Sequence, residues 1–134
     1  MNKKHVINPE LIEKWPLEKH VGVFSKLLID GENTTVLWSK WDPNASAPVH
    51  THPHEQCGIC FEGEIIFTID GEDYTVHAGE FYHIPPNVPH AERNEGVVPA
   101  VLTDFFAPVR SDLLSRRFQA QTLDETSEPE NKEK

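Results

Sequence analysis

Residues 48–58 read PVHTHPHEQCG, which places three histidines at alternating positions and a glutamine two places further on (His50, His52, His54 and Gln56). Alternate side chains of a β-strand leave from the same face, so this pattern gathers three imidazoles and an amide on one side of an extended segment. Such a segment is either a polar strand that faces solvent or a metal site. The choice between the two depends on the rest of the chain.

Short strand-like segments, each ended by turn residues, follow one another with little helix between them. Asp70-Gly71-Glu72 is the strongest hairpin signal, and Asp42-Pro43-Asn44 ends the second segment. This spacing is typical of an all-β sandwich or barrel. Asn8-Pro9-Glu10 predicts a short helix near the start, and SDLLSRRF, with Ser111 as its cap, predicts a last one. The expected strands are 21–29, 34–41, the histidine segment through 62, 64–69, 73–78, 80–84 and 97–106.

The composition limits the classes of partner. The 134 residues suit one domain, and 12 Lys and Arg against 22 Asp and Glu give a net charge of −10, which disfavours binding to nucleic acid. No apolar run has the length of a signal peptide or a membrane span, so we expect a cytoplasmic protein with no membrane partner. Cys57 and Cys60 lie three apart in strand-like sequence and so on opposite faces. We interpret them as small buried hydrophobic residues that form neither a disulfide nor a redox centre.

A fourth histidine, His90, follows a strand and a proline-rich turn. The first run reads Asn44-x5-His50-x-His52-x3-Gln56-x6-Gly63, and the second reads Gly79-x5-Pro85-x-Asn87-x2-His90-x3-Asn94. In spacing, both runs resemble the two motifs of the cupin superfamily. Three positions differ: asparagine replaces glycine at 44 and 87, and glutamine replaces glutamate at 56. Asparagine tolerates the left-handed backbone that glycine supplies.

The resemblance implies a single-domain cupin double-stranded β-helix, a jelly-roll barrel with short terminal helices. It would occupy residues 21–118, after an N-terminal segment with a short helix at 1–20 and before a disordered acidic tail at 119–134. It also implies one divalent transition metal ion (Fe, Mn, Ni or Zn) with the ligands His50, His52, Gln56 and His90.

Two residues of the histidine segment need separate comment. His54 is left over, and we expect it to lie beside the metal without binding it, or in solvent. An amide in place of a carboxylate leaves more positive charge at the metal, so Gln56 favours Lewis-acid chemistry over oxygen activation. The alternative is that Gln56 fills its position without binding metal.

The run Asp104-x-Phe106-x-Pro108-x-Arg110-x-Asp112 follows the second motif. It resembles the KdgF group of small cupins, which convert the unsaturated monouronates left by pectate and alginate lyases to the linear keto form. The resemblance implies catalytic roles for Asp104 and Arg110, and substrate binding by Arg110, Phe106 and Tyr82. A guanidinium suits a uronate carboxylate, and a carboxyl group can transfer protons. The structural alternative is an Asp–Arg ion pair and a core phenylalanine.

Several functions therefore stay open. The first is a non-redox, metal-dependent cupin of the isomerase or lyase type that acts on a small anionic sugar. The others are a cupin dioxygenase, another small-molecule isomerase or decarboxylase, and a non-catalytic sugar-binding cupin. Strand parity does not decide whether Trp38, Trp41 and His83 line the pocket. We expect a homodimer, because the segment before Thr34 has strand character that could extend a partner's sheet.

Overall fold

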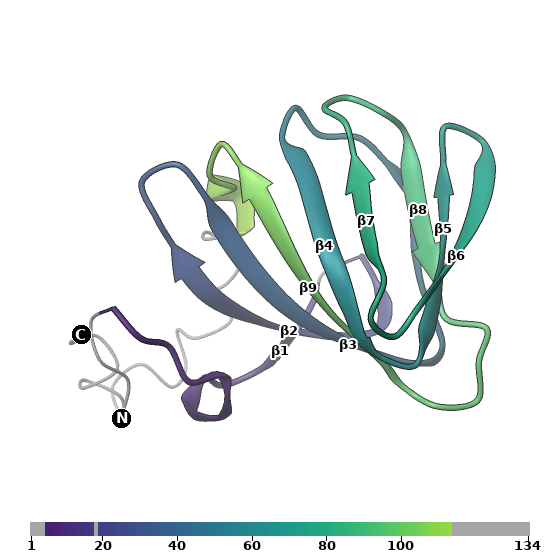
Figure 1. The fold of residues 1–134 in the computed structure, drawn as a ribbon, viewed down its shortest axis with the longest axis horizontal. Coiled ribbons are helices and arrows are strands. Elements are labelled where there is room, and N and C mark those ends of the chain that lie inside the picture. The colour runs from purple at the N-terminus through teal and green to yellow at the C-terminus, as the bar shows by residue number, and fades with distance from the viewer. Residues whose placement is uncertain (1–4, 18, 114–134) are drawn as a thin grey trace.

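A computed structural model describes residues 5–17 and 19–113 of the protein. All of its paired strands are antiparallel, and they curl into a nearly closed barrel (Figure 1). This is the jelly-roll architecture expected from the sequence. In chain order the elements are the 3-10 helix η1 (Pro9–Leu11) and the strands β1 (Trp15–Pro16), β2 (Val21–Asp30), β3 (Thr35–His50), β4 (Glu55–Glu62), β5 (Glu64–Ile69), β6 (Glu72–His77), β7 (Phe81–Ile84), β8 (His90–Arg93) and β9 (Ala100–Ala107).

The long strand β3 connects the two halves of the barrel. Its first half pairs with β2 and β9, and its last residues pair with β8, within the order β6-β5-β8-β3-β9-β4-β7. The prediction that the strand ends at Asp42-Pro43-Asn44 is wrong. Asn44 adopts φ +72° and its N–H donates to the carbonyl of Asn94, whose own N–H donates to Ala45. The chain therefore bends at Asn44 without leaving the sheet.

The histidine segment is not one strand, which corrects the expectation from its alternation. His50 ends β3, His52 and His54 lie in the turn that follows, and Gln56 belongs to β4. Pro53 lies in the middle of this turn and has no N–H to donate to a sheet ladder. The side chains that the sequence places on one strand face are thus carried by two strands and the turn between them.

Other local predictions are confirmed. The side chain of Asn8 accepts a hydrogen bond from the N–H of Glu10 and caps η1. Strands β5 and β6 form the expected hairpin, and Asp70 and Gly71 at its tip both have positive φ, as a type I′ turn requires. The sequence reading missed β1 and β8, which are only two and four residues long.

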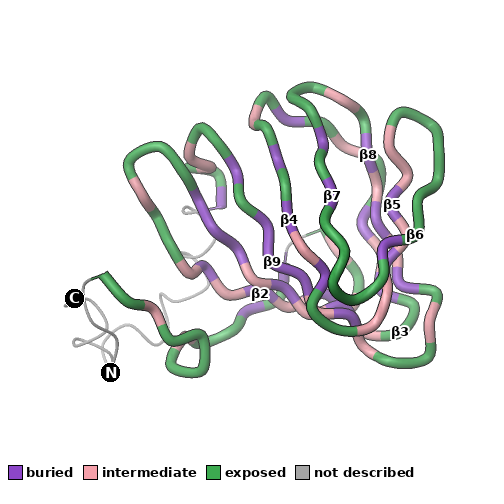
Figure 2. Tube along the Cα trace, in the orientation of Figure 1, coloured by how far each residue is buried: buried purple, intermediate pink, exposed green. Residues whose placement is uncertain are grey.

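Alternation along the strands divides a buried interior from an outer face (Figure 2). The interior is built from Phe67, Ile65, Ile84 and Leu102, each almost fully buried, together with the buried thiol of Cys60. Both cysteines are free and lie on opposite faces, as predicted, but Cys57 is exposed. The expectation that both are buried is therefore wrong for Cys57, because it lies on the outer face of β4.

The chain ends of the expected domain are described only in part. Residues 111–113 are helical, and the rest of the predicted helix and the predicted tail at 119–134 lie outside the described residues. Within the described residues no helix has the length and apolar character needed to cross a membrane.

Candidate metal centre

Three turns and strand ends meet at one end of the barrel, at the top of Figure 1. These are the β3–β4 turn, the β7–β8 turn and the chain that leaves β9. The N–H of Asn87 in the β7–β8 turn donates to the carbonyl of His52 at 2.9 Å, which joins two of them. Asn87 has φ +67°, so the asparagines at 44 and 87 both adopt the left-handed backbone expected from the sequence.

Three histidines gather at this end. His50 and His90 are register partners on β3 and β8, and His52 reaches the same point from the turn. One ring nitrogen from each of the three lies within 4.8 Å of the others. His52 and His90 are buried, and the Nε2 atom of His90 is buried with no hydrogen-bond partner among the described residues.

Backbone carbonyls orient all three rings. The Nδ1 atoms of His50, His52 and His90 lie 2.7, 3.1 and 2.8 Å from the carbonyl oxygens of Pro48, His54 and Val88. A carbonyl oxygen only accepts, so each Nδ1 carries the proton and each Nε2 keeps its lone pair. Histidines that bind metals are oriented in this way by a partner on the second ring nitrogen.

The fourth residue of the motif, Gln56, is buried beside this cluster. Its Nε2 donates to Oδ1 of Asp104 at 3.0 Å, so its Oε1 turns toward the histidines and lies 3.1 Å from Nε2 of His52. Burial lowers the pKa of both His52 and His90 to about 4, so both rings are neutral at pH 7. Two lone-pair-bearing atoms therefore face each other, an arrangement that a cation between them would satisfy.

The donor set fits a divalent transition metal. Ligand atoms at right angles and about 2.1 Å from a metal are separated by about 3 Å, close to the distance between Gln56 and His52. Three imidazoles and an amide oxygen suit Fe, Mn, Ni or Zn. The residues that would hold the ion are His50, His52, Gln56 and His90, the set predicted from the sequence. The geometry of Gln56 favours binding over the alternative that it merely fills its position.

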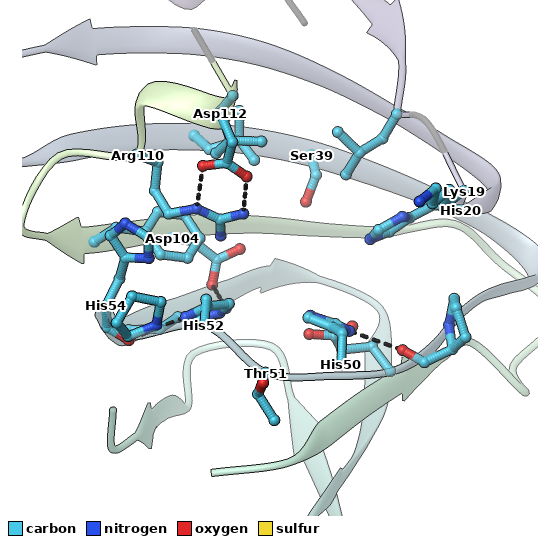
Figure 3. A pocket seen from close by; sticks show the side chains of 18 of the residues that line it. Lys19, His20, Ser39, His50, Thr51, His52, His54, Asp104, Arg110 and Asp112 are labelled. Carbon is cyan, nitrogen blue, oxygen red and sulfur yellow. Dashed lines mark hydrogen bonds and ion pairs between the residues drawn. The ribbon is translucent and has the colours of Figure 1, made fainter. Parts of the chain in front are cut away.

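A cavity of about 510 Å³ opens on the histidine cluster, and Asp104 and Arg110 line it (Figure 3). Phe106 lines it as well. The ion pair between Asp104 and Arg110, the structural alternative to their functional roles, is not formed. Arg110 makes two hydrogen bonds to Asp112, from Nε at 3.0 Å and from Nη2 at 2.6 Å. Its guanidinium carbon lies 4.7 Å from the centre of the Phe106 ring, so Phe106 supports Arg110 as well as forming a wall.

Asp104 is buried on β9 and accepts two hydrogen bonds on one oxygen. Tyr82 donates to Oδ1 at 2.7 Å, and Gln56 donates to the same atom. Burial raises the pKa of Asp104 to about 6, although the two hydrogen bonds and the charge of Arg110 act in the opposite direction. A carboxyl group with this pKa can both accept and return a proton near neutral pH.

The remaining aromatic candidates divide between the two faces. Trp41 lines the cavity, whereas Trp38 lies under the ammonium group of Lys26 and His83 is paired with Glu55 at the exposed surface. Tyr82 is buried behind Asp104 and is not among the residues that line the cavity. Its position favours a supporting role over direct contact with a substrate.

His54 also lines the cavity and is half-buried, and its ring centre lies 5.5 Å from that of His52.

Two further cavity residues escaped the sequence reading. Glu92 is buried two residues after His90, with an unpartnered oxygen, and burial raises its pKa to about 8. Strand alternation could have predicted this position, because residues 90 and 92 of a strand lie on the same face. His20 lies in the turn before β2, with its ring centre 6.1 Å from that of His50. No sequence pattern marks His20, since only the packing of the N-terminal segment brings it to the cavity.

A small antiparallel barrel with a histidine cluster at one end is the architecture expected of a cupin. The family model of the cupin domain matches residues 37–106, and the chain belongs to this family. The sequence resemblance to cupins is therefore confirmed.

The curated relatives that match this chain include both a transcriptional regulator and an enzyme. The HTH-type transcriptional regulator PuuR of Escherichia coli is 35% identical over 77 residues, which cover 54% of this chain and 42% of the regulator. The H2HPP isomerase of Bacillus subtilis is 36% identical over 88 residues, which cover 65% of this chain and 35% of the isomerase. The chain thus spans less than half the length of both relatives.

Solved structures agree on the fold. An RmlC-like cupin from Shewanella frigidimarina superposes with a TM-score of 0.74 at 26% identity, covering 83% of this chain and 96% of that one. KdgF from Halomonas sp. superposes with a TM-score of 0.73 at 20% identity, covering 80% and 96%.

Proposed function

We propose that the protein is a metal-dependent cupin enzyme that converts a small unsaturated uronate from its cyclic form to the linear keto form. One observation carries this proposal. A buried carboxyl group, Asp104, lies on the same cavity as three metal-oriented histidines and the guanidinium of Arg110. The resemblance of residues 104–112 to the KdgF group supplies the substrate class, and the fold similarity to KdgF from Halomonas sp. is consistent with it.

Arg110 would hold the carboxylate of the substrate. Its hydrogen bonds to Asp112 use Nε and Nη2, so Nη1 keeps its donors toward the cavity among the described residues. The pairing with Asp112 fixes the plane of the guanidinium, and Phe106 packs against it. A substrate carboxylate would meet a rigid donor group at little cost in side-chain entropy.

Asp104 would move the proton. Ring opening removes a proton from the anomeric hydroxyl as the bond from the anomeric carbon to the ring oxygen breaks, and the resulting enolate gains a proton on carbon to become the ketone. Oδ1 of Asp104 is occupied by Tyr82 and Gln56, so Oδ2 is the atom that would take and return this proton. A metal bound by the four ligands would supply Lewis-acid stabilisation of the negative charge that develops on oxygen.

The metal is tested first. Purified protein should contain about one equivalent of a divalent metal, and His90→Ala should lose most of it. Full occupancy in a variant that carries both His52→Ala and His90→Ala would show that the ligand assignment is wrong.

The reaction is tested by the ultraviolet absorbance of the conjugated double bond of an unsaturated uronate. The absorbance should fall faster with metal-loaded protein than with chelator-treated protein, and NMR should show the linear keto product. Oxygen consumption during the reaction would indicate a cupin dioxygenase. Unchanged substrate at all protein concentrations would contradict the proposal.

The relation to the regulator PuuR favours one second candidate, a cupin that binds a small ligand without converting it. Calorimetry separates the two. An unsaturated uronate that binds and is recovered unchanged would support the binding function over the enzyme.

A further inference from the structure

Three strands bring Tyr82, Gly58 and Asp104 into one row. Gly58 on β4 is the register partner of Tyr82 on β7 and of Asp104 on β9. Gly58 has no side chain to fill the space between its two neighbours. A Cβ atom at this position would lie 2.5 Å from the hydroxyl oxygen of Tyr82 and 2.6 Å from the carbonyl oxygen of Thr103. The missing side chain is therefore what allows Tyr82 to reach across a whole strand.

The tyrosine uses this gap to hold Asp104. Its hydroxyl donates to Oδ1 at 2.7 Å, and its ring packs against Phe67, with the ring centres 4.4 Å apart. Both Tyr82 and Asp104 are buried. The contact with Tyr82 thus holds the carboxylate of Asp104 in the barrel interior independently of its hydrogen bond to Gln56.

The same oxygen decides which way the amide of Gln56 points. A carboxylate oxygen only accepts, so it selects the orientation in which Nε2 of Gln56 faces Asp104 at 3.0 Å. Oε1 is then left on the side of His52. With the opposite orientation an NH₂ group, which cannot bind a cation, would face the histidines.

We propose that Tyr82 is a positioning residue that, by crossing the gap at Gly58 to hold Asp104, keeps the oxygen of Gln56 turned toward the metal. The inference rests on the proposed metal site. It also gives a physical reason for an amide at position 56. A carboxylate there would face the carboxylate of Asp104 at about the length of a hydrogen bond, where like charges repel.

The first test compares the two tyrosines of the chain. Tyr82→Phe removes the hydroxyl but keeps the ring, and Tyr74→Phe is the matched control because the hydroxyl of Tyr74 bonds to Glu72 at the surface. Cobalt(II) affinity is measured by competition with a chelator, together with the visible spectrum of the cobalt. Partners of metal ligands typically change affinity about 10- to 100-fold. Tyr82→Phe should weaken cobalt binding by about tenfold and alter the spectrum, and Tyr74→Phe should change neither.

A double-mutant comparison distinguishes a positioning role of Tyr82 from a general loss of structure. In a Gln56→Ala background no amide remains to be oriented, so Tyr82→Phe should no longer weaken cobalt binding. An equal loss of affinity in both backgrounds would assign Tyr82 a purely structural role and overturn the inference.

A third comparison exchanges donor and acceptor. The amide introduced by Asp104→Asn can donate to a carboxylate at position 56. The change in cobalt affinity caused by Gln56→Glu should therefore be at least tenfold more favourable in the Asp104→Asn background than beside the native Asp104. The same effect of Gln56→Glu in both backgrounds would contradict the inference. Failure of the wild-type protein to bind cobalt would instead refute the proposed metal site, so the two failures are distinguishable.

Discussion

At the scale of single residues, the proposed function assigns different tasks to two charged groups of the cavity, Arg110 and Asp104. Arg110 is paired with Asp112 at one side of the cavity (Figure 3), and Asp104 is hydrogen-bonded to Gln56, the proposed fourth metal ligand. A group that holds the substrate throughout the reaction stabilises ground state and transition state alike, whereas a group that moves a proton acts only in the transition state. Kinetics can therefore separate the two residues.

Arg110→Ala should act mainly on KM. Loss of a charged hydrogen bond costs about 1.5–3 kcal/mol, so KM should rise by roughly ten- to a hundredfold with a smaller change in kcat. Steady-state kinetics with an unsaturated uronate measures both. A large fall in kcat at unchanged KM would argue against a binding role.

Asp104→Asn should act mainly on kcat. The asparagine carbonyl can still accept from Tyr82 and Gln56, so metal content should stay the same while proton transfer is lost. The expected fall in kcat is on the order of 10² to 10⁴. Near-normal turnover by the folded, metal-loaded variant would leave Asp104 with a structural role alone.

At the scale of elements, the bend in β3 determines where the site can form. Asn44, in the left-handed conformation, lets one strand pair with β9 through its first half and with β8 through its last residues. This bend carries His50 to its register partner His90.

Substitution at Asn44 tests the bend. Asn44→Gly should leave the free energy of unfolding nearly unchanged, because glycine adopts positive φ without strain. Asn44→Val should lower it by about 1–3 kcal/mol, since a β-branched residue is strained in this region. Chemical denaturation of the two variants provides the comparison, and equal stability would show that the backbone at position 44 is not strained.

At the scale of the whole molecule, the barrel buries several titratable groups in one interior. His52 and His90 have pKa values lowered from 6.5 to about 4, so their contribution to stability is present above pH 6.5 and is lost toward pH 4. Asp104 and Glu92 have pKa values raised to about 6 and about 8, so their contributions are lost as the pH rises through those values. Of these four groups, only Glu92 still changes its contribution to stability as the pH rises above 6.5.

Chelator-treated protein should therefore lose stability between pH 6.5 and pH 8. The slope for one proton is about 1.4 kcal/mol per pH unit, which gives a loss of roughly 2 kcal/mol. Denaturation curves at several pH values measure it, and Glu92→Gln should remove the decline. A decline of the same size in Glu92→Gln would assign it to another group.

Assembly is the second prediction at this scale. Strand β2 pairs with β3 along one edge and, among the described residues, only with Trp15–Pro16 along the other. Most of that second edge is left for a strand of another copy. We expect a homodimer, with a mass by light scattering near twice 15.3 kDa at micromolar concentration. A mass near that of one chain would contradict it.

The sequence by itself determined most of the strands and the hairpin at Asp70-Gly71, and it predicted the four residues that we propose as metal ligands. These features depend on local periodicity, turn residues and fixed spacing, which are visible in a single chain. It misassigned the end of β3 and the path of the histidine segment. The bend at Asn44 and the turn around Pro53 keep the spacing of residues along the chain but change the element to which they belong.

Only the tertiary structure decided which groups meet. The partner of Arg110 is Asp112 rather than Asp104, Glu92 faces the cavity, and Tyr82 reaches Asp104 over Gly58. The contact between Tyr82 and Asp104 joins two strands that are distant in the sequence and depends on strand register, whereas Arg110 and Asp112 are neighbours in the segment that follows β9. Register is fixed by the pairing of the whole sheet, so no single segment of the sequence contains it.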